Sequence, residues 1–593
     1  MSIRLRSGIA LVATATLAGA LAVGTSGSVE AKPQPKPPKT MPIQLLSIND
    51  FHGNLEPPTG SSGTVTRLNP DGTTTAVPAG GAEYLSTALQ TAREGHPNSI
   101  TVSAGDNIGA SPLLSAAFHD EPTILALNQM GVQVASVGNH EFDEGSAELL
   151  RMQNGGCRTD VGCYDPAHPF PGASFQYLAA NVTVDSTGQT LFPPTWVTQV
   201  GDVKVGFIGM TLKDTPTIVT ASGVAGLTFH DEVQTANKAA NVLQKQGVKA
   251  IVVLLHQGGQ PASAAYNYDC NANGPGSGLT GDVVPIAEQL SPKIDVVITG
   301  HTHTAYTCDI PDPDGQARLV TSASSFGRLY TDIEGQIDTE SRDFVRSSMT
   351  ATNQVAGHDL PKDPAITALI SQYNTLLGPI KDEPVGYIAG TILGRGATTQ
   401  EEPLGDVIAD SQLAATSSAG TGNAVVAFMN PGGIRADLVY PQSGTEGDGV
   451  VTYGEAFTVQ PFTNLVETIS LTGAQIVTML QQQFTGLNAT APKVLQVSNG
   501  FTYTLDNTKT GADKVVTDSI RLNGSPLVPT ATYRVTVNNF LAGGGDNFTV
   551  LKEGTDPFVG AIDLDAFTAY LTANSTPVSP LAVPPANRIT IVN

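Results

Sequence analysis

The stretch Gly138-Asn139-His140-Glu141-Phe142-Asp143 directly follows a short apolar run, Val134 to Val137. Runs this short, rich in Val and Ile and separated by helix-length segments, predict parallel strands of an α/β sheet. Polar groups gather beyond the carboxyl ends of such strands, so we expect the motifs that follow the runs to meet at one edge. The other four runs that end in polar motifs are Ile43 to Ile48, Ser99 to Val102, Ala250 to Leu255 and Val296 to Thr299.

The residues after these runs have the chemistry of metal ligands. Carboxylates, an amide and imidazoles without cysteine suit Zn²⁺, Mn²⁺ or similar ions. One catalytic ion usually takes three protein ligands, so a larger set predicts two divalent ions that share a bridging carboxylate. A single histidine at a strand end is more often structural, but five motifs at five strand ends favour a metal site. The candidates are Asp50, His52, Asp106, Asn139, His256, His301 and His303.

This motif set resembles that of the calcineurin-like metallophosphoesterases, and specifically the secreted 5′-nucleotidase and UDP-sugar hydrolase branch. The resemblance implies that His140 stabilises transition-state charge on phosphate and that Asp143 orients His140. It implies an α/β fold: a four-layer metallophosphoesterase β-sandwich with flanking helices, a linker helix, then a smaller α+β substrate-binding domain. It also implies two metal groups that share Asp106, with Asp50, His52 and His303 in one and Asn139, His256 and His301 in the other.

Three strings in the second half of the chain suggest a ligand site. The segment Asn430 to Arg435 contains glycines that permit close backbone approach, and Arg435 can offer a planar fork to phosphate. The other two strings are Phe457 to Asn464 and the glycine-rich Asn538 to Phe548.

These strings resemble the C-terminal substrate domain of the same 5′-nucleotidases. The resemblance implies that Phe462 and Phe540 sandwich a nucleobase and that Asp546 accepts hydrogen bonds from ribose hydroxyls. Stacking on aromatic rings tolerates any base, so the preferred nucleotide is left open. The further substrate contacts that it implies are Asn430, Arg435 and Asn464.

One segment departs from the family pattern. Family members usually keep an Arg close before a Leu-Gly-Asn segment, whereas this chain has Leu404-Gly405-Asp406 with Arg395 several residues earlier. Arg395 is a candidate substrate contact, and Asp406 replaces the usual amide.

The first residues have the layout of a secretory signal peptide. Arg4 and Arg6 precede an apolar stretch from Ile9 to about Val23, and Val29-Glu30-Ala31 offers a cleavage site. The stretch is short against the roughly 20 residues that a membrane span needs. We expect residues 1–31 to be a signal peptide and the mature protein to be secreted, without stable membrane insertion.

A chain of 593 residues exceeds what one hydrophobic core normally organises, which predicts two large domains. Asp363 followed by Pro364 predicts the start of an amphipathic helix that Gly378-Pro379 would end. The predicted boundaries are a Pro/Lys-rich linker at 32–41, a metallophosphoesterase domain at 42–357, a linker helix at 358–383 and a nucleotide-binding domain at 384–593.

Four cysteines fit an oxidising compartment and allow three pairings, which spacing cannot distinguish. We favour Cys157 with Cys163 and Cys270 with Cys308, because each pair then closes an irregular insertion. A zinc site is the rival interpretation, but the Cys-x-x-Cys spacing is missing.

The combined pattern predicts an exported 5′-nucleotidase that releases phosphate by in-line attack of a hydroxide. The formal net charge of −23 disfavours nucleic-acid polymers as partners, because proteins that follow a phosphate backbone need a basic surface. A UDP-sugar, other nucleotide-sugar, dinucleotide or 2′,3′-cyclic nucleotide remains an alternative substrate. A non-catalytic extracellular nucleotide-binding protein is the alternative from another class, and the oligomeric state is left open.

Overall fold

The computed structural model describes residues 39–58, 60–219, 223–394, 400–462, 464–489 and 492–593. The residues from Thr40 to Asn593 form one compact unit. The domain boundaries at 42–357, 358–383 and 384–593 therefore stay predictions. The predicted signal peptide, residues 32–38 of the predicted linker and Arg395 lie outside the described residues.

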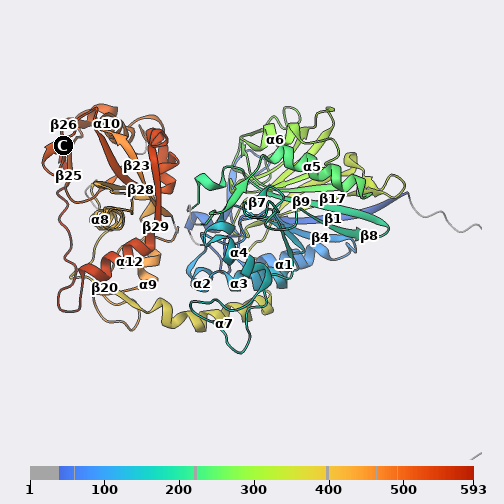
Figure 1. Cartoon of the computed structure of the whole chain (residues 1–593), viewed down its shortest axis with the longest axis horizontal. Coiled ribbons are helices and arrows are strands. Elements are labelled where there is room, and N and C mark those ends of the chain that lie inside the picture. The colour runs from blue at the N-terminus through green and yellow to red at the C-terminus, as the bar shows by residue number, and fades with distance from the viewer. Residues whose placement is uncertain (1–38, 59, 220–222, 395–399, 463, 490–491) are drawn as a thin grey trace, which may run out of the picture. The chain divides into compact units, whose positions relative to one another are not determined.

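Two β-sheets organise the N-terminal half of this unit (Figure 1). In the first sheet, β1 (Thr40–Ile48), β4 (Ser99–Ser103), β5 (Val134–Ser136) and β6 (Gln176–Leu178) run parallel. Its other strands are β17 (Leu329–Asp338), antiparallel to β1, and β18 (Asp343–Phe344) and β19 (Thr350–Val355) beside β17. The second sheet has the order β15 (Ala305–Pro311), β16 (Ala317–Ala323), β14 (Val296–Thr299), β11 (Ala250–His256), β9 (Val203–Thr211) and β8 (Thr195–Val200).

The five predicted strands all form, but the expectation of a single sheet is wrong. The strands β1, β4 and β5 belong to the first sheet, and β11 and β14 to the second. Successive side chains of a strand face opposite sides, and here both sides are buried. Leu45 packs into the core between the sheets with Val252, whereas its neighbour Leu46 packs into the core under the helices. A run that is apolar on both faces cannot reveal which sheet it joins.

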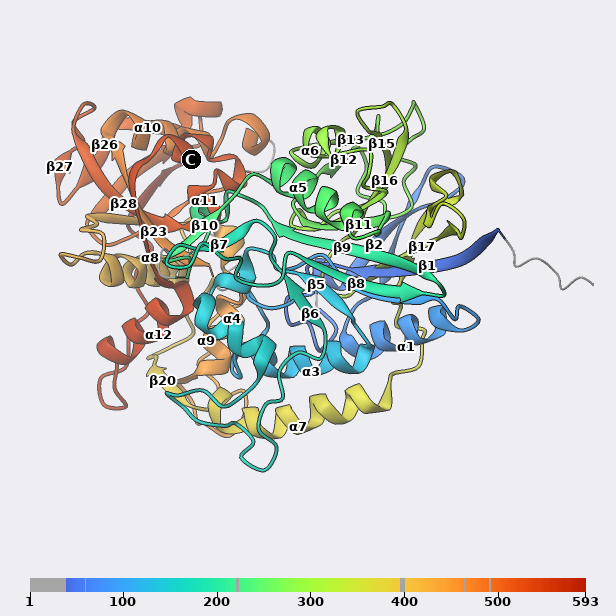
Figure 2. The same ribbon diagram turned by 45° about the vertical axis from the view of Figure 1, so that its right-hand side comes forward.

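Helices cover the outer faces of both sheets. Figure 2 shows α5 (Glu232–Lys245) and α6 (Val283–Gln289) on one side of the strands, and α1 (Ala82–Arg93) and α3 (Glu121–Met130) on the other. The α1 and α3 side chains share one core with α4 (Gly145–Asn154) and α7 (Pro364–Lys381). This order of helices, sheet, sheet and helices is the predicted four-layer sandwich.

The predicted linker helix begins as expected but ends later. The Asp363 carboxylate accepts the N–H of Ala365 at 2.9 Å, and Pro364 occupies the first turn. The helix continues through Gly378-Pro379 to Lys381. Pro379 lies in the last turn, where its missing N–H removes a single hydrogen bond, and Leu377 and Ile380 pack against the core there.

The C-terminal half is α+β, as predicted. Its five-stranded sheet has the order β24 (Gln496–Val497), β21 (Val426–Met429), β28 (Thr532–Asn538), β23 (Leu465–Thr472) and β29 (Thr555–Ile562). A second sheet contains β27 (Ser525–Pro526), β26 (Val515–Leu522), β25 (Phe501–Asp506) and β30 (Ile589–Val592). Its helices are α8 (Pro403–Thr416), α9 (Tyr453–Val459), α10 (Gly473–Gln482), α11 (Asn539–Ala542) and α12 (Asp563–Asn574).

Shorter elements complete the fold. In the N-terminal half they are β2 (Thr64–Leu68), β3 (Thr74–Pro78), α2 (Leu113–Ala116), β7 (Val182–Val184), β10 (Leu227–Phe229), β12 (Gln260–Pro261) and β13 (Leu279–Thr280). The two-stranded sheet of β20 (Pro384–Tyr387) and β22 (Val450–Thr452) follows α7 along the chain. None of the helices in the described ranges combines the length and apolarity needed to cross a membrane.

Both favoured cysteine pairs are disulfides. Cys157 joins Cys163, and Cys270 joins Cys308. The second bond connects the loop after β12 to β15, so it ties an irregular insertion to the edge of the second sheet.

The carboxyl group of Asp406 is buried in the C-terminal half. It lies on α8 with its Oδ2 atom 3.6 Å from Nε of Arg588. Burial raises the pKa of Asp406 to about 9, against the opposing effect of Arg588. Between about pH 4 and pH 9, the Asp406 carboxyl is therefore protonated in the folded protein and ionised in the unfolded chain. This group lowers the free energy of unfolding as the pH rises across that window.

We predict that Asp406→Asn flattens this pH dependence, because the amide does not have to take up a proton when the protein folds. Near pH 8 the free energy of unfolding should exceed that of the wild type by at least ~1 kcal/mol. Asp410→Asn is the matched control, since Asp410 pairs with both terminal nitrogens of Arg588, at 2.8 and 2.7 Å, and its loss should destabilise. Urea unfolding at pH 5, 7 and 8 measures this, and parallel curves for wild type and Asp406→Asn would contradict it.

Candidate functional site

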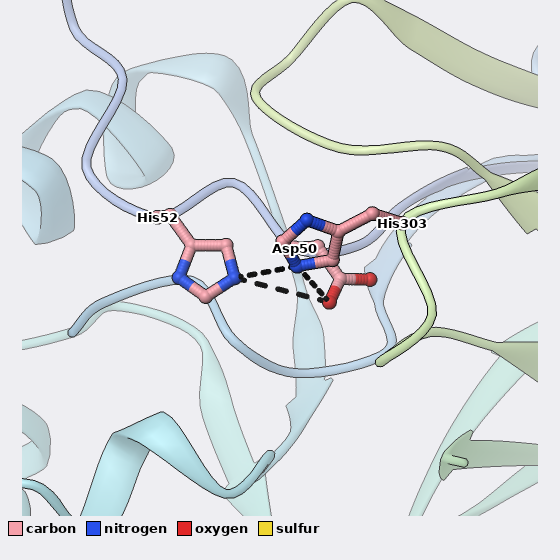
Figure 3. Close-up of side chains that lie close together, drawn as sticks. All are labelled: Asp50, His52 and His303. Atoms are coloured by element: carbon pink, nitrogen blue, oxygen red, sulfur yellow. Dashed lines mark hydrogen bonds and ion pairs between the residues drawn. The ribbon is translucent and has the colours of Figure 1, made fainter. Parts of the chain in front are cut away.

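The first predicted metal group is assembled from the loops that follow β1 and β14. Figure 3 shows Asp50, His52 and His303 pointing toward one another. The Nε2 atoms of His52 and His303 lie 3.1 Å apart, and Oδ1 of Asp50 lies 3.3 Å from Nε2 of His303. Asp50 and His52 are buried and His303 is 39% exposed, so three potential ligand atoms converge where the core meets solvent.

The second group lies directly beside the first. Asp106, His256 and His301 offer ligand atoms within 4.8 Å of one another. Oδ2 of Asp106 is 3.0 Å from Nε2 of His256 and 3.7 Å from Nε2 of His52, so this carboxylate reaches both groups. Oδ1 of Asn139 lies 3.0 Å from Nδ1 of His301. All seven predicted ligands are thus brought together.

The hydrogen bonds of two histidines leave the nitrogens that face the cluster available to a cation. Nδ1 of His52 lies 2.8 Å from the carbonyl of Gly109, and Nδ1 of His256 lies 2.8 Å from that of Ala104. A carbonyl can only accept, so Nδ1 carries the proton and Nε2 the lone pair in the neutral ring. The buried Nε2 of His256 then faces Oδ2 of Asp106 at 3.0 Å, and these two acceptors cannot pair without a proton or a cation between them. This is the arrangement that orients histidine ligands in metal sites.

Burial and neighbouring charges shift the pKa values of these histidines in different directions. Burial lowers the pKa of His52 to about 3 and that of His301 to about 4, which keeps both rings neutral as metal ligands require. Burial alone would lower the pKa of His256 too, but the Asp106 carboxylate raises it to about 9. The excess of buried carboxylate beside His256 favours a cation at this place.

Backbone strain marks the ligand loops. Asp50, His52, Asp106, His301 and His303 all have positive φ, between 46° and 73°. Such angles are uncommon for residues other than glycine and concentrate at functional sites. Glycines provide the accompanying space: a Cβ on Gly138 would lie 2.1 Å from Oδ1 of Asp106, and one on Gly300 would lie 2.8 Å from Oδ2 of Asp50.

The predicted catalytic pair lies beside both groups. Nδ1 of His140 is 2.7 Å from Oδ2 of Asp143, and the backbone N–H of His140 donates to Oδ1 of Asp106 at 2.9 Å. Burial would lower the pKa of His140, but Asp143 and Asp106 raise it to about 10. The ring is therefore a proton-carrying group about 27% exposed, able to donate to an anion.

Sequence reasoning missed the residues that hold these loops. Glu141 is buried, and its two carboxylate oxygens accept the backbone N–H groups of Asp106 and Asn107, each at 2.9 Å. Asn49 donates to Oδ2 of Asp50 at 2.6 Å. The sequence signal was position alone: Glu141 stands beside His140 in the quoted motif, and Asn49 directly precedes Asp50.

A third group of potential ligands has another explanation. His119, Glu144 and Glu148 also bring ligand atoms within 4.8 Å of one another. Nη1 of Arg158 lies 2.8 Å from Oε2 of Glu144 and 3.4 Å from Oε1 of Glu148. The Arg158 guanidinium already pairs with both carboxylates, which accounts for this group without a bound ion.

The predicted aromatic pair is exposed rather than packed in a core. Phe462 and Phe540 are 45% and 48% accessible, in contrast with the buried Phe428 and Phe548 nearby in the sequence. The guanidinium carbon of Arg435 lies 5.4 Å from the centre of the Phe462 ring. Two large aromatic rings left exposed are a typical feature of a ligand site.

Two of the polar residues predicted to bind substrate make hydrogen bonds to other side chains of the protein. Nδ2 of Asn430 donates to Oδ2 of Asp546 at 2.8 Å. Nδ2 of Asn464 donates to Oδ2 of Asp563 at 3.3 Å, so this side chain is partly committed to α12. Asp406 is buried against Arg588, and Arg395 lies outside the described residues.

A cavity of about 550 Å³ is lined both by predicted metal and catalytic residues and by predicted substrate-binding residues. Its volume is in the range of small-molecule sites. Its lining includes His52, His140 and His303 from the ligand cluster, with Asn430, Phe462, Asn464, Phe540 and Asp546 from the C-terminal half.

Two family models match the chain. The model of the calcineurin-like phosphoesterases matches residues 43–305, and that of the 5′-nucleotidase C-terminal domain matches residues 384–553. The first match contains all predicted metal and catalytic residues, and the second contains the predicted substrate residues.

Individual proteins are similar over most of this chain. The cell wall protein Lmo0130 of Listeria monocytogenes is 34% identical over 89% of this chain and 66% of its own length. The endonuclease YhcR of Bacillus subtilis is 31% identical over 92% of this chain and 41% of its own length. This chain therefore spans less than two thirds of these two relatives. The crystal structure of a 5′-nucleotidase precursor from Thermus thermophilus aligns with a TM-score of 0.56 at 25% identity, covering 93% of this chain and all of that one.

We predict that Glu141→Gln lowers both the melting temperature and the metal affinity. Glutamine has one acceptor oxygen, and its NH₂ group would face backbone N–H donors, which costs about 1–3 kcal/mol. Thermal unfolding in EDTA and metal titration measure the two effects. Glu144→Gln is the control, because that carboxylate is 42% exposed and should contribute under about 1 kcal/mol. Equal behaviour of the two variants would contradict the role of Glu141.

Proposed function

Because this chain belongs to the calcineurin-like phosphoesterases that carry a 5′-nucleotidase C-terminal domain, we propose that it is a two-metal hydrolase that releases phosphate from nucleotides. The observation that carries the proposal is a single cavity with two kinds of lining. One part consists of His52 and His303 from the first ligand group with His140, and the other is the exposed pair Phe462 and Phe540. The first suits a phosphoryl group and the second a planar base.

The metal part would hold two divalent ions, with Zn²⁺ or Mn²⁺ as the candidates from ligand chemistry. Asp50, His52 and His303 would hold one, His256, His301 and Asn139 the other, and Asp106 would bridge them. Two bound ions of this kind polarise a phosphoryl group and lower the pKa of water, which makes hydroxide accessible at neutral pH.

The protein's own contribution to the reaction centres on His140. Its proton-carrying ring lies at the cavity and can donate a hydrogen bond to a phosphoryl oxygen as negative charge develops there. Asp143 accepts from Nδ1, which fixes the ring and directs Nε2 toward the substrate. The backbone N–H of His140 donates to Asp106, which fixes the position of His140 relative to the predicted metal ligands.

The C-terminal half would bind the nucleoside. Phe462 and Phe540 would stack on the base, and each stacked base contributes roughly 1–3 kcal/mol whatever its identity. Arg435, now over the Phe462 ring, would offer its guanidinium to the sugar–phosphate portion. Asn430 and Asn464 line the same cavity, and Asp546 would accept the ribose hydroxyls.

We also propose that the protein works outside the cytoplasm. Two disulfides are typical of an oxidising compartment, and one relative is named a cell wall protein. N-terminal sequencing of the exported protein tests the proposal, and a mature N-terminus at Lys32 would support the predicted cleavage.

Phosphate release from purified protein tests the function. AMP, UMP, ATP, UDP-glucose and a generic phosphodiester are supplied in parallel with Mn²⁺, Zn²⁺ or EDTA. EDTA-sensitive release from monophosphates supports a 5′-nucleotidase. Cleavage of only UDP-glucose or the diester would keep the two-metal site and overturn the substrate, and binding without turnover would overturn the enzymatic proposal.

We predict that His140→Ala lowers kcat by about a hundredfold or more, as expected when a transition-state donor is removed. Metal content should stay near that of the wild type, because the ring belongs to neither ligand group. Asp143→Asn is the companion variant. The His140 ring stays in place there but loses its charged partner, so we expect a smaller loss of kcat. Turnover of His140→Ala within a few-fold of the wild type would refute the role.

We predict that Phe540→Ala raises KM for AMP by roughly 5- to 150-fold, the equivalent of 1–3 kcal/mol of stacking. Hydrolysis of a small ester without a base should change little. Phe540→Tyr keeps the ring and is the control. A similar loss on both substrates in Phe540→Ala would argue against stacking.

A further inference from the structure

A chain of buried side-chain amides ends at the carboxylate of Asp546. Asn538 and Asn430 are 1% and 2% accessible. Nδ2 of Asn538 donates to Oδ1 of Asn430 at 2.9 Å, and Nδ2 of Asn430 donates to Oδ2 of Asp546 at 2.8 Å. Asn538 stands at the end of β28, Asn430 directly after β21 and Asp546 in the glycine-rich loop. The three side chains therefore join separate segments of the C-terminal half.

The direction of this hydrogen-bond chain is fixed by the backbone. Oδ1 of Asn538 accepts the N–H of Leu541 at 2.9 Å, as the N-cap of α11. A backbone N–H can only donate, so the oxygen of Asn538 must face Leu541 and its NH₂ must face Asn430. The oxygen of Asn430 is then turned to Asn538, and its NH₂ to Asp546. A helix cap thus determines which atom of Asn430 reaches the carboxylate.

Asp546 needs such an anchor because its own loop does not determine where the side chain points. Asp546 and Asn547 both have positive φ, at 50° and 65°. Nδ2 of Asn488 holds the carbonyl of Asp546 at 2.7 Å, which fixes the backbone but not the carboxylate. Oδ1 of Asp546 lies 3.8 Å from Nζ of Lys493, beyond hydrogen-bond distance. The contact with Asn430 is therefore the short bond that sets the carboxylate plane.

We propose that Asn538 is a positioning residue for ribose recognition, acting through Asn430 on Asp546. The inference rests on the proposed function, in which Asp546 accepts the ribose hydroxyls. Asn430 then serves mainly to aim Asp546, with its amide engaged at both ends by protein groups. The ordered amide chain keeps one carboxylate oxygen occupied and presents the other to the ligand.

Asn538→Asp tests the relay without removing the helix cap. Aspartate caps helices as well as asparagine does, so the bond to the Leu541 N–H is kept. Its second oxygen can only accept, so it must turn the NH₂ of Asn430 toward itself. The oxygen of Asn430 would then face Asp546, and the two acceptors repel each other. Asn523→Asp is the matched control, since it adds the same charge in the exposed turn between β26 and β27, away from the chain of amides and from the cavity lining.

The readout is calorimetric binding of adenosine and 2′,3′-dideoxyadenosine, which share the base but differ in the ribose hydroxyls. Hydrogen bonds to a charged group predict that the wild type prefers adenosine by roughly tenfold to a hundredfold. Asn538→Asp should bring this ratio close to one, and Asn523→Asp should leave it unchanged. In an Asp546→Ala background, Asn538→Asp should have no further effect, which a merely structural role would not produce.

Each other outcome overturns the proposal. A wild-type ratio near one would mean that Asp546 does not read the hydroxyls. An unchanged ratio in Asn538→Asp, or an effect that persists without Asp546, would remove Asn538 from this role. If Asn538→Asp does not fold, Asn538→Ser keeps a capping oxygen, is too short to reach Asn430 and is expected to give the same loss. Nucleoside binding without phosphate release would defeat the proposed function alone, whereas phosphate release with an unchanged ratio would defeat this inference alone.

Discussion

The buried carboxylate of Asp106 is the contact on which the candidate site depends. One oxygen lies within 3.7 Å of imidazoles from both ligand groups, and the other accepts the backbone N–H of His140. Burying a carboxylate is costly unless cations or donors surround it. The neighbouring histidines, the backbone N–H of His140 and the proposed ions all stabilise that carboxylate. The four-layer sandwich serves to bring five strand ends from two sheets to this carboxylate.

Sequence periodicity predicted the strands, the start of α7 and the ligand set, because each depends on local pattern: apolar runs, an Asp-Pro cap and polar residues at strand ends. It could not divide the strands between two sheets, since Leu45 and Leu46 are equally apolar although they face different cores. It also placed the end of α7 too early at Gly378-Pro379, because tertiary packing carries the helix onward to Lys381.

The supporting residues escaped prediction for a different reason. Glu141 acts on backbone groups 34 and 35 positions away, and Asn538 on a side chain 108 positions away, so no local pattern reports either role. Asp406 occupies a position expected to carry an amide at the substrate segment, yet it is buried against Arg588. The strained φ angles at five of the predicted metal ligands show the same principle: a folded scaffold must hold these conformations, because the residues do not prefer them.

The most direct test of the account is the number of metal ions bound per chain, measured by inductively coupled plasma mass spectrometry after saturation with Mn²⁺ or Zn²⁺. The account predicts two ions for the wild type. It predicts that Asp106→Ala loses most of both, because this carboxylate contacts both ligand groups. One ion in the wild type, or an Asp106→Ala variant that still binds one ion at full affinity, would contradict a shared two-metal centre.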